Sequence, residues 1–182
     1  MCNLQDHYQA WDAYAEYMRD IAPLRGRPIA LPQGPVRPSE PTPVVFAEGD
    51  GSRLELLPWG WKPASGKGLV INLRSENRRD GPAARGLTFP TAFYEYAGDK
   101  PPKAQWRFAS ATNEPIAFAV IRRGPAYALA TCEPGPDVAP IHDRQPVILP
   151  RGAWRRWLTA ADWPADLAAP SPAGALRAAR TR

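Results

Sequence analysis

Residue 2 of the chain is a cysteine, and its chemistry depends on whether Met1 is retained. Removal of Met1 would leave Cys2 with an α-amine and a thiol on adjacent carbon atoms, whose unperturbed pKa values are roughly 7.7–8.0 and 8.5. Such an amine forms an imine with an aldehyde, and the neighbouring sulfur can close on that imine to give a five-membered thiazolidine. No other natural residue supplies this pair of nucleophiles. The alternative is that a cysteine at position 2 is incidental.

Glu95 lies between Tyr94 and Tyr96 at the end of an expected strand. Partial burial there would raise the pKa of its carboxyl and allow it to carry protons during imine formation. The alternative is a surface carboxylate paired with an arginine.

His142 is one of two histidines and lies in a polar, proline-bounded segment ahead of an apolar run. This position is typical of a loop side chain that faces a cleft, where an imidazole could orient or deprotonate a nucleophile or a sugar hydroxyl. The alternative is a structural histidine, which is what we expect of His7 on the first helix.

Amide and guanidinium groups elsewhere in the chain could bind a sugar or a phosphate. Asn72 could hold an α-amine or a sugar oxygen, or else stabilise a turn at a strand end. Arg74 and Arg144 could clamp phosphates through charge-assisted hydrogen bonds, or else form ion pairs with Glu76 or Asp143. Trp59 and Trp61 could stack on unpaired bases, and we expect at least one of them in the core.

Short strands carry most of these residues. Apolar spacing over residues 4–18 predicts an amphipathic helix that ends before Pro23. Two β-rich runs around the turn at 48–52 predict a hairpin. Further strands are expected over 68–73, 106–109, 116–121, 126–131 and 146–149, and a last helix near Pro150 with Trp154, Trp157 and Leu158.

The composition narrows the class of protein. The net charge is +5, and 19 of the 23 basic residues are arginine, which suits phosphate, although a GC-rich genome would also enrich arginine. The two cysteines fit a reducing compartment, and Cys132 is expected to be inert packing. No apolar run is long enough for a bilayer, and neither metal-ligand spacing nor a phosphate-binding glycine loop is present. We therefore expect a cytoplasmic protein without cofactor or metal.

One domain is expected over residues 1–164, because 182 residues suffice for one ordinary core. Residues 165–182 are rich in alanine and proline and lack aromatic side chains. This composition predicts a flexible tail.

Four segments, taken in order, resemble the SOS-response-associated peptidase (SRAP) family. They are Met1-Cys2, Asn72-Leu73-Arg74-Ser75-Glu76, Tyr94-Glu95-Tyr96 and 141–146 (Ile-His-Asp-Arg-Gln-Pro). The Trp-Gly-Trp-Lys-Pro run at 59–63 is also similar to the family's Trp-Gly segment, so the resemblance covers roughly residues 2–158.

The resemblance implies an α+β fold, in which a curved, barrel-like and mostly antiparallel sheet is flanked by helices. It also implies a protein of the DNA-damage response that crosslinks through Cys2 to abasic sites in single-stranded DNA. The catalytic residues would be Cys2, Asn72, Glu95 and His142. The DNA-binding residues would be Arg74, Arg144, Trp59 and Trp61. We expect a monomer that associates with the nucleoid when DNA is damaged.

The chain departs from the family pattern in two places. Asn3-Leu4 follows the cysteine where family members usually have Gly-Arg, and the family's Asn-x-Ala-Pro-Thr segment is not recognisable, with residues 37–43 near its place. Two alternatives stay open beside the crosslinking function. One is a thiol peptidase that uses Cys2, Glu95 and His142 on other proteins, whereas release of Met1 by the protein's own peptidase-like chemistry belongs to the crosslinking function. The other is a degenerate member that only holds single-stranded DNA in an arginine-lined groove.

Overall fold

The computed structural model describes residues 2–112 and 114–182, and the expected removal of Met1 therefore concerns a residue outside this description. Thirteen strands, two α-helices and three short 3-10 helices occur in the described part. In chain order they are β1 (Gln5–His7), α1 (Trp11–Met18), β2 (Leu24–Arg25), β3 (Gly34–Val36), β4 (Pro41–Glu48), β5 (Gly51–Pro58), β6 (Asn72–Arg74), η1 (Pro82–Ala84), β7 (Arg85–Thr88), β8 (Ala92–Ala97), β9 (Ala104–Ser110), β10 (Phe118–Arg123), β11 (Ala126–Cys132), β12 (Gln145–Pro146), η2 (Arg151–Ala153), α2 (Trp154–Thr159), η3 (Ala165–Leu167) and β13 (Leu176–Arg180).

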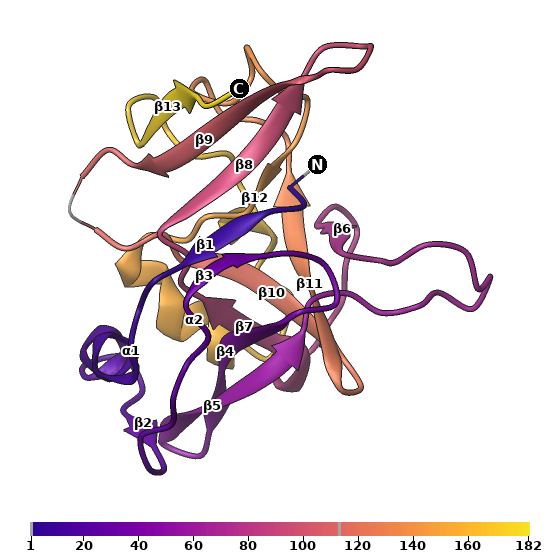
Figure 1. Cartoon of the computed structure of the whole chain (residues 1–182). Helices are drawn as coiled ribbons and strands as arrows, with labels where there is room; N and C mark the ends of the chain where they lie inside the picture. Colours follow the sequence, from indigo (N-terminus) through magenta and orange to yellow (C-terminus); the bar gives the residue numbers. More distant parts are fainter. Residues whose placement is uncertain (1, 113) are drawn as a thin grey trace.

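The strands form two sheets (Figure 1). The smaller sheet has the order β13-β9-β8-β1-β3, and all its pairs are antiparallel. The larger has the order β12-β11-β10-β7-β4-β5-β2, with β6 added parallel to β11. The expected α+β domain with a curved, mostly antiparallel sheet is confirmed, but neither sheet closes into a barrel within the described residues.

Successive side chains along each strand of the larger sheet point to opposite faces, and an apolar core lies on each face. Phe118 and Val120 on β10 pack with Phe93 and Phe108 of the smaller sheet, so the two sheets share this core. Their neighbours on β10 face the opposite side, where α1 and α2 pack. The helices therefore cover one face of the larger sheet, and the smaller sheet covers the other.

The helix expected near Pro150 is confirmed as α2, which buries Trp154, Trp157 and Leu158. The hairpin expected around residues 48–52 is also confirmed, as β4 and β5. Gly49 has φ +59° in its turn, a conformation that glycine adopts without strain.

The first residues differ from the expected helix over 4–18. The helix spans only Trp11–Met18, and residues 5–7 form β1 between β3 and β8, so His7 lies on a strand. Polar side chains on β1 are nevertheless buried. The carboxylate of Asp6 accepts a hydrogen bond from Tyr94 at 2.8 Å, which offsets the cost of its burial. The helical spacing of residues 4–18 gave no sign of these contacts, because β3, β8 and Tyr94 are distant from β1 in the sequence.

The segment 165–182 also differs from the flexible tail that its composition predicted. Residues Leu176–Arg180 form β13, which pairs with β9 from Leu176↔Ser110 to Arg180↔Trp106. Only Leu176 of this strand is buried, and backbone hydrogen bonds to β9 fix the rest. A composition argument weighs side-chain burial alone and therefore misses an edge strand of this kind.

Candidate active site

Cys2 lies at the end of the core between the two sheets, directly ahead of β1. Its side chain is 1% exposed and belongs to the same apolar cluster as Phe93. The Asn72 side-chain amide donates a hydrogen bond to the Cys2 carbonyl at 2.8 Å. Burial raises the pKa of the Cys2 thiol well above its ordinary value, and the nearby Glu95 raises it further. The thiol therefore keeps its proton at neutral pH.

Glu95 faces inward because β8 alternates. Phe93 and Glu95 point into the space between the sheets, whereas Tyr94 and Tyr96 point to the outer face of the smaller sheet. The Glu95 carboxyl is 1% exposed, and this burial raises its pKa to about 7, although a hydrogen bond with the Cys2 backbone acts against the rise. A carboxyl with this pKa is present in both protonation states near neutral pH.

His142 brings a second titratable group to Glu95. The two side chains approach with His142 Nε2 3.7 Å from Glu95 Oε2. On the other side of the ring, Nδ1 lies 3.0 Å from the Arg144 backbone N–H, 3.1 Å from the Arg144 carbonyl and 3.0 Å from the Asp143 carboxylate. Either neutral tautomer therefore finds a partner. Burial lowers the pKa of His142, so Nε2 presents a proton or a lone pair to Glu95 without a net charge on the ring.

Asn72 is held in place by the larger sheet. It begins β6, which runs parallel to β11 with Asn72 opposite Leu129. Just before it, the Ile71 carbonyl accepts a hydrogen bond from the Trp59 indole at 2.8 Å. Gly60 has φ +101°, and a Cβ at this position would lie 2.7 Å from Ile71 Cγ2. Glycine is thus required at the point where the chain passes Ile71, the residue before Asn72.

Arg144 does not lie free for a phosphate. Its guanidinium donates two hydrogen bonds to Glu76, at 2.6 and 3.1 Å, and another to the Thr131 carbonyl at 2.8 Å. Only 8% of the residue is exposed. This geometry corresponds to the alternative of an ion pair with Glu76, so Arg144 ties the loop that holds His142 to β6 and β11.

The other three candidate DNA-binding residues have different environments. Trp59 is fully buried, and its ring is not available for stacking on a base. Trp61 is partly exposed, with the Arg123 guanidinium 5.2 Å from its ring centre. Arg74 is exposed, and as the second residue after Asn72 it shares that residue's face of β6. Arg74 and Trp61 therefore remain accessible beside the site.

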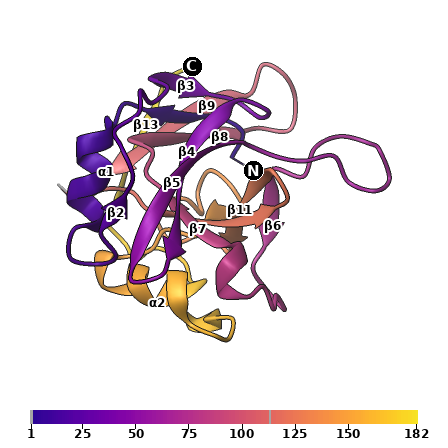
Figure 2. The ribbon, with the colours of Figure 1, turned by 90° about the horizontal axis from the view of Figure 1, so that it is seen from below.

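A loop over residues 62–69 lies between Trp61 and Val70. Paired backbone hydrogen bonds between Trp61 and Val70 close it, and it projects from the body in both views (Figures 1 and 2).

Two polar clefts adjoin the site, and they contain residues that sequence reasoning missed. The first, about 580 Å³, is lined by Asn3, Tyr96, Pro101, Pro102, Lys103, His142 and Arg182. The second, about 630 Å³, shares Asn3, Tyr96 and Arg182 and continues over the outer face of the smaller sheet to Arg37 and Tyr94. The alternation of Tyr94-Glu95-Tyr96 was a usable signal for the tyrosines. Nothing in the sequence indicated Arg182, because its position depends on β13.

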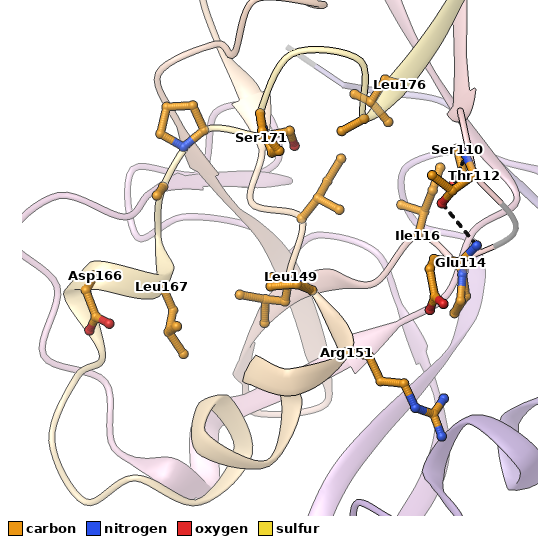
Figure 3. Close-up of a pocket in the computed structure, with 17 residues that line it drawn as sticks. Ser110, Thr112, Glu114, Ile116, Leu149, Arg151, Asp166, Leu167, Ser171 and Leu176 are labelled. Carbon is orange, nitrogen blue, oxygen red and sulfur yellow. Dashed lines mark hydrogen bonds between the residues drawn. The ribbon is translucent and has the colours of Figure 1, made fainter.

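A third pocket, about 540 Å³, is apolar and lies away from these groups (Figure 3). Ile116, Leu149, Leu167 and Leu176 line it, and none of the candidate catalytic residues does. Among residues 2–112 and 114–182, no group of three or more His, Cys, Asp or Glu side chains is placed to hold a metal ion. No helix in the same ranges is both long and apolar enough to cross a membrane.

The site therefore combines a buried cysteine at position 2, a carboxyl and an imidazole in mutual contact, and an amide that fixes the cysteine backbone. A family model described as SOS response associated peptidase (SRAP) matches residues 1–180. The chain belongs to this family. It is also 28% identical over 180 residues to the abasic site processing protein YoaM of Bacillus subtilis (strain 168), an alignment that covers 87% of this chain and 79% of the relative.

Solved structures have the same fold. A phage-related protein from Bordetella bronchiseptica matches with a TM-score of 0.74 at 24% identity, over 100% of this chain and 94% of the other. A protein from Bacteroides thetaiotaomicron matches with a TM-score of 0.78 at 15% identity, over 100% of this chain and 92% of the other. At these identities the likeness concerns the fold alone.

Proposed function

We propose that the protein, once Met1 is removed, forms a covalent thiazolidine between Cys2 and the aldehyde of an abasic site in single-stranded DNA. The observation that carries the proposal is the Glu95 carboxyl, buried beside the Cys2 backbone, with a pKa near neutrality and a histidine 3.7 Å away. The substrate class comes from the name of the Bacillus subtilis relative. The family's description links it with the SOS response.

The chemistry needs no cofactor. The α-amine of Cys2 attacks the aldehyde carbon of the open sugar and gives a carbinolamine. Glu95 in its acid form donates a proton to the departing hydroxyl, water leaves and a protonated imine forms, which leaves Glu95 as a carboxylate. The Cys2 sulfur then adds to the imine carbon, while the thiol proton passes to the Glu95 carboxylate and restores its acid form. One aldehyde and one aminothiol give one thiazolidine and one water, with no change in oxidation state.

The order of the two nucleophiles follows from their environment. The buried thiol holds its proton, so the amine is the better first nucleophile. His142 Nε2 lies 3.7 Å from the Glu95 carboxyl and holds that group in place for the proton transfers. Asn72 holds the Cys2 carbonyl and thereby fixes the direction of the amine. Arg74, exposed on the same face of β6, meets a phosphate next to the reacting sugar.

The test is to incubate the protein with a single-stranded oligonucleotide that contains one abasic site, and with the intact oligonucleotide, and to look for an adduct that survives denaturation. The wild-type protein should form it with the abasic strand only, and its intact mass should lack Met1. Cys2→Ser should reach the imine, so its complex should survive denaturation only after borohydride reduction. A protein with an extra residue ahead of Cys2 should form neither product.

The outcomes separate the remaining alternatives. A stable adduct from the protein with an extra residue ahead of Cys2 would mean that the thiol or a lysine reacts alone. The aminothiol mechanism would then be wrong. Binding of DNA that is unchanged by Cys2→Ala, without any adduct from the wild type, would identify a non-covalent binder. Cleavage of an unrelated peptide, again without an adduct, would identify a thiol peptidase.

A further inference from the structure

Three cations from distant segments lie along the two clefts beside the site. Lys103 follows the loop between β8 and β9 and lines the cleft that contains His142. Arg182 follows β13 and lines both clefts, and Arg37 follows β3 at the far end of the second. All three side chains are exposed, and none has an ion pair among the described residues. Their charges are therefore available to a ligand.

The backbone of Arg182 is held in place by hydrogen bonds with β9. Its carbonyl accepts a hydrogen bond from the Gln105 backbone N–H at 3.0 Å, and the preceding Thr181 N–H donates to the Gln105 carbonyl at 2.9 Å. The Gln105 side chain in turn donates to the Tyr96 hydroxyl at 2.7 Å. The end of β13 is thus linked through Gln105 to Tyr96, which lines both clefts.

The clefts offer aromatic surface between these cations. Tyr94 and Tyr96 project from the outer face of β8, and Tyr8 lines the same second cleft with 58% of its surface exposed. Asp6 is the one acidic side chain among the described residues that line this cleft; its carboxylate accepts a hydrogen bond from the Tyr94 hydroxyl at 2.8 Å and pairs with the Arg107 guanidinium at 3.5 Å. Cations that alternate with aromatic side chains along a groove are the features that bind single-stranded nucleic acid without reading its sequence.

We propose that Lys103, Arg182 and Arg37 form a phosphate-binding track that carries the strand flanking the reacting nucleotide from His142 over the outer face of the smaller sheet. The inference rests on the proposed function and extends it by naming a path and its contacts. The strand leaves the site past His142 and Lys103, crosses Tyr96 beside Arg182 and ends at Arg37. The side chains of Tyr94 and Tyr96 offer stacking surfaces to its bases along this path.

The experiment compares two triple variants with equal loss of charge. The first is Arg37→Ala with Lys103→Ala and Arg182→Ala. The control is Arg27→Ala with Arg155→Ala and Arg177→Ala, three exposed arginines that line neither cleft. Arg177 is on β13 itself, about 17 Å from Arg182 at 3.4 Å per residue, which exceeds a Debye length of about 10 Å in 0.1 M salt.

Affinity for an intact single-stranded oligonucleotide is measured between 50 and 200 mM salt. Each lost phosphate contact should reduce the slope of log K against log salt by about 0.7, or about 2 for the track variant, and lower affinity about a hundredfold at 0.1 M salt. The control should keep the wild-type slope. Both variants should react with free 2-deoxyribose, which has no flanking phosphates, at the wild-type rate.

These measurements distinguish a failure of the phosphate-binding track from a failure of the proposed crosslinking function. If the two variants share one slope and one affinity, the track is wrong even though the wild type still forms its adduct with an abasic strand. If the track variant also loses its reaction with deoxyribose, the three residues support the site itself, and the track is again wrong. If the wild type forms no adduct with either substrate, the proposed function fails, and the inference fails with it.

Discussion

The substitution Glu95→Gln should make the protein more stable in mild alkali while it slows the reaction. A carboxyl whose pKa rises on folding binds its proton more tightly in the native state than in the unfolded chain. Its contribution to stability is therefore fully present below pH 4.5 and is lost as the pH rises through about 7. Glutamine has almost the same shape and no charge to bury, so the variant does not suffer this loss.

The magnitude follows from the two pKa values. With 4.5 in the unfolded chain and about 7 in the native protein, the buried carboxyl costs under about 1 kcal/mol at pH 5 and about 3 kcal/mol at pH 8. The difference in free energy of unfolding between variant and wild type should therefore widen by about 2 kcal/mol between these pH values. His7 titrates alike in both proteins, and its contribution cancels in this comparison.

Urea unfolding of both proteins at pH 5 and pH 8 measures the effect. Glu76→Gln is the matched control, because the hydrogen bond from Arg144 lowers the pKa of Glu76, whose ionisation is then almost complete over this range. Its difference from the wild type should be the same at both pH values. The adduct rate of Glu95→Gln should fall about a hundredfold, since general acid–base catalysis contributes at least that much. An equal stability difference for Glu95→Gln at pH 5 and pH 8 would refute the burial argument.

Four further outcomes are expected. Arg144→Ala should lower the free energy of unfolding by about 2 kcal/mol and leave the salt slope of DNA binding unchanged, because the guanidinium joins parts of the protein. Arg74→Ala should reduce that slope by about 0.7 with little change in stability. Asn72→Ala should slow adduct formation more than it weakens DNA binding, because it releases the Cys2 carbonyl. His7→Gln should remove part of the loss of stability below pH 6.5, up to about 1 kcal/mol per pH unit, because burial lowers the pKa of His7 to about 3 in the native protein.

The sequence was sufficient for residues whose role depends on their immediate neighbours. The alternation of Tyr94-Glu95-Tyr96 predicts that Glu95 and the tyrosines face opposite sides of a strand, and the turn residues at 48–52 predict a hairpin. The grouping of Cys2 with Asn72 came only from the resemblance, and the structure brings the two into contact through one hydrogen bond.

Other features depend on pairing between distant segments, which local patterns do not encode. Residues 4–18 have helical spacing, but β1 gains more by pairing with β3 and β8. Arg144 had three chemically reasonable partners in the sequence, a phosphate, Glu76 or Asp143, and only the fold decides for Glu76. Arg182 could not be placed before β13 was known.

The position of β1 inside the smaller sheet sets the order in which the site can form during synthesis. Gln5 pairs with Phe93, so β1 has no complete set of partners until β8 has been made. The ribosome adds about 5–20 residues per second, so the first residues remain unpaired for at least several seconds before β8 has been synthesised. During that interval the start of the nascent chain is open to the enzymes that trim new polypeptides. Maturation of the nucleophile can thus precede the folding that encloses it.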